Sequence, residues 1–170
     1  NGIPRDEGVR IILGSAATPQ RIKEIGDRKQ QFYLMLLERN PPQILPGVSA
    51  LLSDMRKNGW SLAAASSSKN AAHVLAATGL TGCFDAIITG YDFHHPKPHP
   101  DIFLTAVEAL GAQPAHAFVV EDATNGVRAA VAGGFRCIAV ANSESADALS
   151  AAGAMTVVST TGELTLELFL

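Results

Sequence analysis

Polar side chains that could act together on one ligand follow apolar runs at several places in the sequence. The run "SLAAA" leads into "SSSKN", which begins at Ser66, and "AFVV" leads into the adjacent acids Glu121 and Asp122. The segment "HHPKPHPDIF" places Lys97 between two prolines, which exclude a helix or a central strand there. Lys97 is therefore predicted to lie on a rigid loop that holds its ammonium at a defined place.

Together these side chains supply the chemistry of phosphoryl transfer. A hydroxyl and an ammonium can bind phosphoryl oxygens, and a metal ion held by carboxylates can bridge the phosphate to the protein. Adjacent acids at the end of a buried strand repel each other unless a cation neutralises them, and Mg²⁺ prefers oxygen ligands of this kind. We predict that Glu121 and Asp122 bind Mg²⁺; the alternative is that Asp122 caps the next helix and Glu121 points to solvent.

The serines after the first run open a predicted helix. Free N–H groups at a helix start, together with hydroxyls, form a natural anion site. A hydroxyl of this segment, which comprises Ser66, Ser67, Ser68, Lys69 and Asn70, is able to donate to a phosphoryl oxygen. The alternative is that one of the serines is only an N-cap.

The elements that must position these residues begin at Pro46, where short apolar runs alternate with helical segments. Helices are predicted at 47–58, 70–78, 100–110, 125–132 and 144–151, between the runs "SLAAASS", "DAIITG", "AFVVED", "CIAVAN" and "MTVVS". This alternation predicts an α/β fold with a Rossmann-like, doubly wound parallel sheet. In such a sheet, ligands bind beyond the carboxyl ends of the strands.

The first forty residues differ, because they carry a helical pattern with no strand. The segment "RNPPQILPG" then breaks the pattern with three prolines and a glycine. We predict a partial helical cap domain at 1–44 and an α/β core domain at 45–170. Lys29 falls on the helical face of Ile22, Ile25, Phe32 and Leu36, so it is predicted to point inward, with snorkelling to solvent as the alternative.

Composition excludes several classes of partner. The 170 residues are 47% hydrophobic and 17% charged, with a net charge of −3, which provides no basic surface for nucleic acid. No apolar run is long enough to span a bilayer, so we expect no membrane partner. The two cysteines have no metal spacing and no signal peptide precedes them, which favours a cytoplasmic setting, and we expect a monomer.

The five histidines give no clear metal motif. His95 and His99 are four residues apart, which on a helix would favour a metal pair, but the prolines between them exclude a helix. We interpret all five as surface or loop residues, with a zinc site as the open alternative.

The order of the polar motifs distinguishes two known families. A receiver domain also has acids, a hydroxyl and a lysine, but its acids come first and its lysine last, whereas here Lys97 precedes Glu121. The order resembles that of the haloacid dehalogenase superfamily, in which Ser66, Lys97 and the acidic pair match the second, third and fourth motifs. Over essentially the whole chain the resemblance is to the β-phosphoglucomutase-like branch, through "GIPRDEGVRIIL", "DRKQQFY", "LPGV", "ASSSKN", "KPHPDIF" and "EDATNGVRAA".

The resemblance implies a role for each matching residue. Ser66 and Lys97 would bind the transferring phosphoryl group, Glu121 with Asp122 would hold Mg²⁺, and Ser68, Lys69 and Asn70 would line the phosphate site. From the cap, Arg5 and Lys29 would reach the phosphate at the other end of a sugar phosphate. The implied activity is Mg²⁺-dependent phosphoryl transfer on a small phosphorylated sugar, most like the conversion of β-glucose 1-phosphate to glucose 6-phosphate.

The sequence departs from the family pattern at two points. Gly8 stands where the mutase cap usually has a serine, and no Asp-x-Asp follows an apolar run, although that motif supplies the nucleophile and the general acid and base. We therefore expect that the chain lacks the first strand of the core, between the strands that end at Ser66 and Glu121, and is inactive alone. The alternatives are a phosphatase for a small phosphometabolite and a non-catalytic phosphosugar-binding protein.

Overall fold

The computed structural model describes the backbone of residues 5–170 and the side chains of residues 9–170. Contacts divide the chain into two compact units, Asn1–Pro42 and Gln43–Leu170. The division falls in the proline-rich segment, two residues before the predicted boundary at 44 and 45.

The first unit is a pair of helices. Helix α1 (Arg5–Leu13) is followed by a 3₁₀ turn and by α2 (Pro19–Arg39), which Thr18 caps by accepting a hydrogen bond from the Arg21 N–H. Proline at the first helical position is compatible with this start, because its missing N–H has no intrahelical partner there. The predicted helical character of this region is confirmed.

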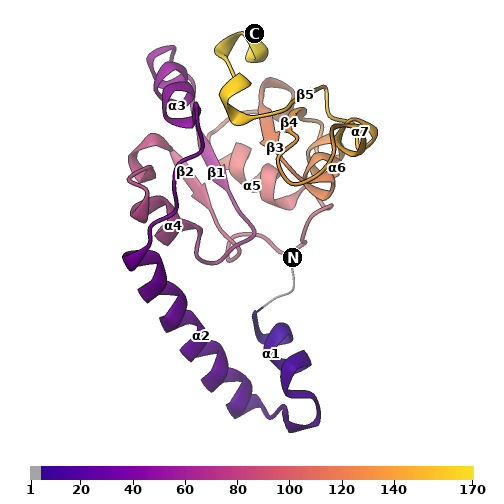
Figure 1. The fold of residues 1–170 in the computed structure, drawn as a ribbon. Helices are drawn as coiled ribbons and strands as arrows, with labels where there is room; N and C mark the ends of the chain where they lie inside the picture. Colours follow the sequence, from indigo (N-terminus) through magenta and orange to yellow (C-terminus); the bar gives the residue numbers. More distant parts are fainter. Residues whose placement is uncertain (1–4) are drawn as a thin grey trace. The chain divides into compact units, whose positions relative to one another are not determined.

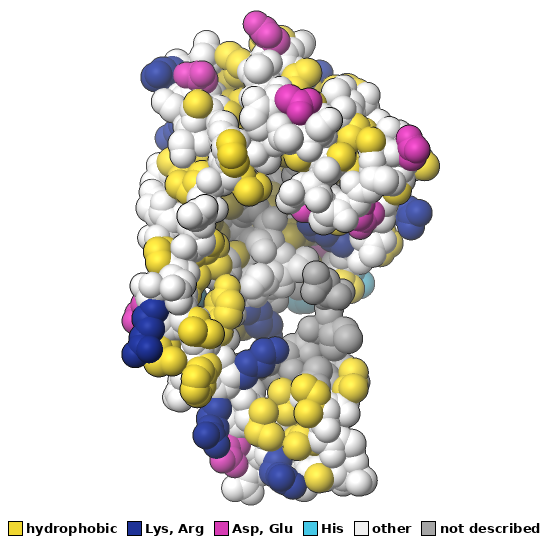
Figure 2. Space-filling view, viewed as in Figure 1, with side chains coloured by type: hydrophobic (Ala, Val, Ile, Leu, Met, Phe, Trp, Pro, Cys, Tyr) yellow, Lys and Arg dark blue, Asp and Glu magenta, His cyan; other side chains and the backbone are white. Residues whose placement is uncertain are grey.

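The prediction that Lys29 points inward is wrong, because Lys29 is exposed. Phe32 and Leu36 on the same face are 61% and 52% exposed, while Ile22 from that face is buried. Figure 2 shows hydrophobic side chains beside basic ones on the surface of these helices. The helical period identified an apolar face correctly, but α1 covers only part of it.

In the second unit, helices alternate with strands as predicted (Figure 1). The helices are α3 (Val48–Lys57), α4 (Ala71–Ala77), α5 (Asp101–Ala109), α6 (Thr124–Ala132) and α7 (Ala146–Ala151). The strands are β1 (Ala63–Ala65), β2 (Ala86–Ile88), β3 (Phe118–Glu121), β4 (Arg136–Val140) and β5 (Thr156–Val158). Short 3₁₀ turns lie at Thr81–Cys83, Pro114–His116, Thr161–Glu163 and Leu166–Phe169.

The strands are all parallel, but they form two sheets rather than one. β1 pairs with β2, and β4 pairs with β3 and β5. Within the described residues no ladder joins β1 to β3. That a missing strand belongs between the strands ending at Ser66 and Glu121 stays a prediction. In the part of the chain that the structure describes, β1 and β3 each keep one edge without a strand partner.

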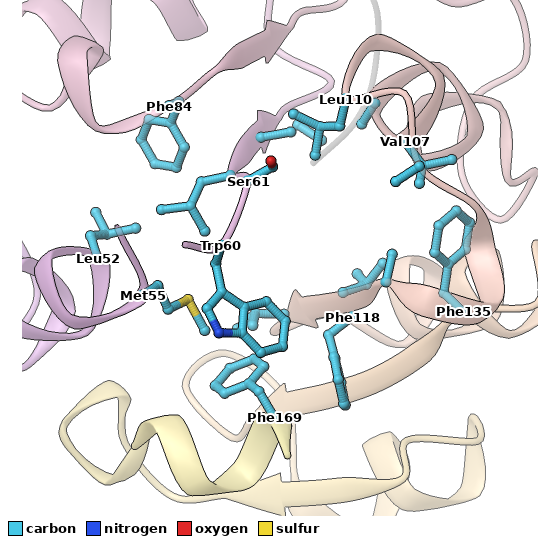
Figure 3. Close-up of a pocket in the computed structure, with 18 of the residues that line it drawn as sticks. Leu52, Met55, Trp60, Ser61, Phe84, Val107, Leu110, Phe118, Phe135 and Phe169 are labelled. Carbon is cyan, nitrogen blue, oxygen red and sulfur yellow. The ribbon is translucent and has the colours of Figure 1, made fainter. Parts of the chain in front are cut away.

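An apolar cavity of about 610 Å³ lies between the two sheets. Figure 3 shows it surrounded by aromatic and aliphatic side chains, among them Phe84, Val107, Leu110, Phe118 and Phe135. The volume of one strand residue is about 160 Å³, the product of a spacing of roughly 4.8 Å between strands, a rise of roughly 3.3 Å per residue and roughly 10 Å between packed layers. The cavity is therefore large enough for a single strand segment of about four residues, the length of β3.

Two groups of buried residues hold the second unit together. One joins Ile88 of β2 and Phe103 of α5 to Val119 of β3 and Cys137 of β4, so it spans both sheets. The other joins Met55 of α3 to the C-terminal residues Leu164 and Phe169.

Aromatic contacts and one hydrogen bond tie the end of the chain to the beginning of this unit. Phe169 packs edge-on against Trp60 and Phe118, with ring centroids 6.2 Å and 5.3 Å away. The Thr161 hydroxyl donates to the Pro46 carbonyl at 2.7 Å. The proline-rich segment is thus anchored by residues more than a hundred positions later in the chain.

Asp85 joins α3 to the start of the two-stranded sheet. Its carboxylate accepts from the Leu62 N–H at 2.8 Å and from the Arg56 guanidinium at 2.5 and 2.6 Å. The hydrogen bond from Leu62 and then that from Arg56 lower the pKa of Asp85 below its usual value.

Across the described part of the chain, none of the helices has the length and apolar character needed to cross a lipid bilayer.

Candidate active site at the carboxyl ends of the strands

Four of the residues predicted from the sequence line one pocket of about 360 Å³: Ser66, Lys97, Glu121 and Asp122. The full lining is Leu45, Ala65, Ser66, Ser67, Lys97, Val120, Glu121, Asp122, Val140, Asn142 and Thr161. The pocket lies where β1, β3 and β4 end, because the carboxyl ends of parallel strands meet at one edge. Ala65, Val120 and Glu121 also line the apolar cavity, so the two spaces share a boundary.

Lys97 and Glu121 form an ion pair in this pocket. The Lys97 ammonium donates to Glu121 Oε1, and the two side chains are only 19% and 9% exposed. The ammonium also lies 4.8 Å from the centre of the Phe103 ring. Lys97 is on the loop between β2 and α5, as predicted, so its charge is held in a defined position within a largely buried environment.

The other oxygen of Glu121 faces the start of α6. Glu121 Oε2 accepts from the backbone N–H groups of Asp122 and Ala123 at 3.0 and 3.2 Å. Gly126, which is buried in the first turns of α6, lies so close that a Cβ there would overlap the Glu121 carboxylate. Glu121 does not point to solvent, which contradicts the alternative considered above.

Asp122 is held by a serine after β4. Its Oδ2 accepts from the Ser143 hydroxyl at 3.1 Å, and the same hydroxyl lies 3.0 Å from the Asp122 carbonyl oxygen. Asp122 does not cap α6, whose N-cap residue is Ala123 without a side-chain cap. Instead, the Thr124 N–H donates to Glu144 Oε2 at 3.1 Å.

The serine segment forms a compact turn before α4. The Ser66 hydroxyl accepts from the Ser68 N–H at 3.2 Å, and the Ser68 hydroxyl accepts from the Asn70 N–H at 3.1 Å. The Lys69 ammonium lies 4.6 Å from the centre of the Tyr91 ring. Ser66 reaches the pocket, while the roles of Ser68, Lys69 and Asn70 stay predictions.

Several residues of the site were missed by the sequence analysis. Asn142 and Thr161 line the pocket, and Ser143 holds Asp122. Asn142 and Ser143 follow the apolar run "CIAV", so the rule that found Ser66 and Glu121 would also have found them. No local signal identifies Thr161, which comes from the C-terminal part of the chain.

The donor atoms in this pocket fit Mg²⁺. The Asp122 and Glu121 carboxylates and the Asn142 side-chain carbonyl offer oxygen atoms, and Mg²⁺ combines one or two carboxylates with water and phosphate oxygens. No histidine or cysteine lines the pocket among the described residues, so its ligand type does not favour zinc.

The predicted cap residues belong to the other unit. Arg5 begins α1, and its side chain is outside the described residues. Lys29 is exposed on α2. Their predicted role at the distal phosphate stays a prediction.

Cys137 of β4 is buried close to the charged pair. Burial and the nearby charge of Glu121 raise the pKa of the Cys137 thiol to about 12, while Lys97 acts in the opposite direction. The thiol therefore stays protonated at neutral pH.

A model of the haloacid dehalogenase-like hydrolase family matches residues 8–134, which is most of the chain. The chain belongs to this family. The β-phosphoglucomutase of Bacillus subtilis is 35% identical over 173 aligned residues, which cover 98% of this chain and 74% of that protein. The β-phosphoglucomutase of Mycobacterium tuberculosis is 33% identical, over 81% of this chain and 59% of that protein.

The fold of this haloacid dehalogenase-like chain is also that of solved relatives. The crystal structure of a β-phosphoglucomutase from Clostridium difficile is 29% identical and superposes with a TM-score of 0.84. The match covers 98% of this chain and 75% of that structure. The chain therefore spans roughly three-fifths to three-quarters of the length of these relatives.

Proposed function

We propose that this protein takes part in Mg²⁺-dependent phosphoryl transfer on a small phosphorylated sugar, most like the conversion of β-glucose 1-phosphate to glucose 6-phosphate. The observation that supports this most is the gathering of a hydroxyl, an ammonium and two carboxylates, Ser66, Lys97, Glu121 and Asp122, around one pocket. The family and the similar β-phosphoglucomutases are consistent with it.

In this proposal each side chain meets a different part of the phosphoryl group. The Ser66 hydroxyl donates to one phosphoryl oxygen, and Lys97 offsets negative charge that accumulates during transfer. Asp122 and Glu121 hold Mg²⁺, and the bound ion neutralises charge on the phosphate oxygens. Ser143 orients the Asp122 carboxylate through the hydrogen bond at 3.1 Å.

The nucleophile is the remaining requirement. The 170 residues contain no Asp-x-Asp after an apolar run, and we propose that the nucleophilic carboxylate arrives on an extended apolar segment between β1 and β3. Three features support this placement: the unpaired edges of both strands, the room for about four strand residues, and the shared boundary with the polar pocket. Without such a segment we expect the chain to be catalytically silent.

The metal part of the proposal is tested by calorimetric titration of Mg²⁺ into the chain and into Asp122→Ala. We expect affinity to fall in Asp122→Ala and to be unchanged in Asp147→Ala, which removes an exposed acid on α7. Equal Mg²⁺ affinity in all three proteins would exclude Asp122 as a ligand.

The catalytic part is tested by measuring phosphate release and hexose-phosphate isomerisation. The chain is assayed alone and joined to a leading apolar strand that bears either Asp-x-Asp or Asn-x-Asn. We expect turnover only with Asp-x-Asp, together with more cooperative unfolding for both extended forms. Mg²⁺-dependent turnover by the chain alone that is lost in Asp122→Ala would contradict the proposed source of the nucleophile.

A phosphatase is the second candidate, favoured by the hydrolase character of the matched family and by Gly8 in place of the serine usual in the mutase cap. In the extended, active form, Lys29→Ala should impair isomerisation more than hydrolysis if Lys29 and Arg5 anchor a distal phosphate. Selective loss of hydrolysis would favour the phosphatase instead. Phosphosugar binding without any turnover in the extended form would favour a non-catalytic binding protein.

A further inference from the structure

Three side chains, two from the loop before α5 and one from the first residue of α5, converge although the sequence offers no helical metal motif. His95 Nδ1 lies 2.6 Å from Asp101 Oδ2, and His99 Nδ1 lies 2.8 Å from Asp101 Oδ1. The two imidazole rings are 4.6 Å apart between centroids. One potential ligand atom from each of the three residues can be chosen so that all lie within 4.8 Å of one another.

The loop backbone brings these residues together without a helix. The His99 N–H donates to the Pro96 carbonyl at 3.0 Å, which closes a turn, and the His95 N–H donates to Asp101 Oδ2 at 2.9 Å. Asp101 is therefore fixed by a backbone contact that is independent of the imidazoles. Such support of a carboxylate by a neighbouring donor is typical of metal ligands.

The position of Asp101 at the start of α5 explains its charge but not the two imidazoles. A carboxylate in the first turn is stabilised by the helix dipole and needs no further partner. His95 and His99 are nevertheless held against its two separate oxygens, although they are 65% and 49% exposed and could extend into solvent. Two imidazole nitrogens and one carboxylate are thereby gathered in one place, with potential ligand atoms within 4.8 Å of one another.

We propose that His95, His99 and Asp101 bind a divalent transition-metal ion, for which Zn²⁺ is the reference. In the metal-bound form each imidazole carries its proton on Nε2, so that the Nδ1 lone pairs face the ion. Tetrahedral bonds of about 2.0–2.1 Å place neighbouring ligand atoms roughly 3.3 Å apart. The contacts at 2.6 and 2.8 Å must open slightly and the widest separation of 4.8 Å must close, which exposed side chains can do by rotation.

The donor set distinguishes this site from the proposed magnesium site. Two imidazole nitrogens and one carboxylate suit Zn²⁺ and similar ions, whereas Mg²⁺ prefers oxygen donors. Three protein ligands leave a fourth tetrahedral position for water. None of the three residues lines the polar pocket, but Lys97 lies between the two histidines in sequence, so a bound ion would restrict the loop that carries Lys97.

The test is calorimetric titration of Zn²⁺ into the 170-residue chain with Cys83→Ser, at slightly alkaline pH and in excess Mg²⁺. The substitution removes a partly exposed thiol, and Mg²⁺ competes for the acidic pair. We expect this parent protein, in which His95, His99 and Asp101 are unchanged, to bind one Zn²⁺ per chain. Affinity should fall at least about tenfold in His95→Ala, in His99→Ala and in Asp101→Asn. The matched control is His73→Ala, an exposed histidine on α4, which should bind Zn²⁺ as tightly as the parent.

The proposal would be overturned by absence of Zn²⁺ binding in the parent or by equal affinity in the loop variants. Loss of binding in His73→Ala would overturn it as well, because the ion would then lie elsewhere. If Asp101→Asn fails to fold, the two exposed histidine variants decide, with circular dichroism as the check on their structure. The readout requires no catalytic activity, so it is independent of the proposed phosphoryl transfer.

Discussion

Replacement of Gly126 by alanine should act on the protein through Glu121. The backbone of Gly126 is helical and accommodates alanine, which alone would favour the helix by about 1 kcal/mol. The added Cβ, however, would overlap the Glu121 carboxylate and displace it from Lys97 and from two backbone N–H groups. The substitution therefore sets a small helical gain against the loss of a largely buried ion pair.

The magnitude follows from these two contributions. Loss of one partner of a buried pair costs about 3–5 kcal/mol, and we take about 3 because Lys97 and Glu121 retain some exposure. Subtraction of the helical gain leaves a net destabilisation of about 2 kcal/mol. With an m-value of about 2 kcal/mol/M, the urea midpoint should fall by about 1 M.

A double-mutant cycle with Glu121→Ala isolates the cause. When the carboxylate is absent, Gly126→Ala should be neutral or stabilising by up to about 1 kcal/mol, which gives a coupling of about 2–3 kcal/mol. Gly82→Ala is the matched control, because a Cβ at Gly82 meets no atom within 4 Å. An equal cost of Gly126→Ala in both backgrounds would refute the reasoning, since the Cβ would then act on something other than Glu121.

Three further predictions concern single residues. In the extended, active form, Lys97→Ala should lower turnover by about two to three powers of ten while circular dichroism is unchanged. A normal rate would exclude a catalytic role for Lys97. Cys83 should react with a thiol reagent in the native chain, whereas Cys137, buried and with a pKa near 12, should react only after unfolding; equal labelling rates would contradict this. The pKa of Asp85 is lowered in the folded state, so its stabilising effect is complete above the unfolded pKa and is lost as pH falls through the folded pKa. Below about pH 4 the parent should therefore lose more stability, measured by urea titration, than Asp85→Asn. Parallel pH profiles of the two proteins would argue against this role of Asp85.

The part of the site that the sequence predicts is the part carried by strand ends. Ser66, Glu121 and Asp122 directly follow apolar runs, and parallel strands bring such positions to one edge. Lys97 was predicted from its flanking prolines, which fix a loop but do not specify its partner. The pairing with Glu121 depends on how the loop crosses the sheet, and only the structure reveals it.

The helical periodicity of the sequence was less informative about which element packs against the apolar face of a helix. It placed Lys29 on an apolar face of α2, but much of that face is exposed, because the pattern of one helix does not say which element packs against it. In the same way, the prolines correctly excluded a helix around His95 and His99. The turn closed by Pro96 and His99 nevertheless brings the two rings together, which no spacing rule for helices anticipates.

The packing of Phe169 against Trp60 has a consequence for how the second unit is completed during synthesis. These residues are separated by 109 positions (169 − 60), and closing a flexible loop of that length costs about 4 kcal/mol in chain entropy. The hydrophobic group around Met55 cannot close until Phe169 has left the ribosome, so a nascent chain holds an incomplete core until then. Since Trp60 is the single tryptophan of the sequence, its fluorescence provides a direct optical signal for this last closure.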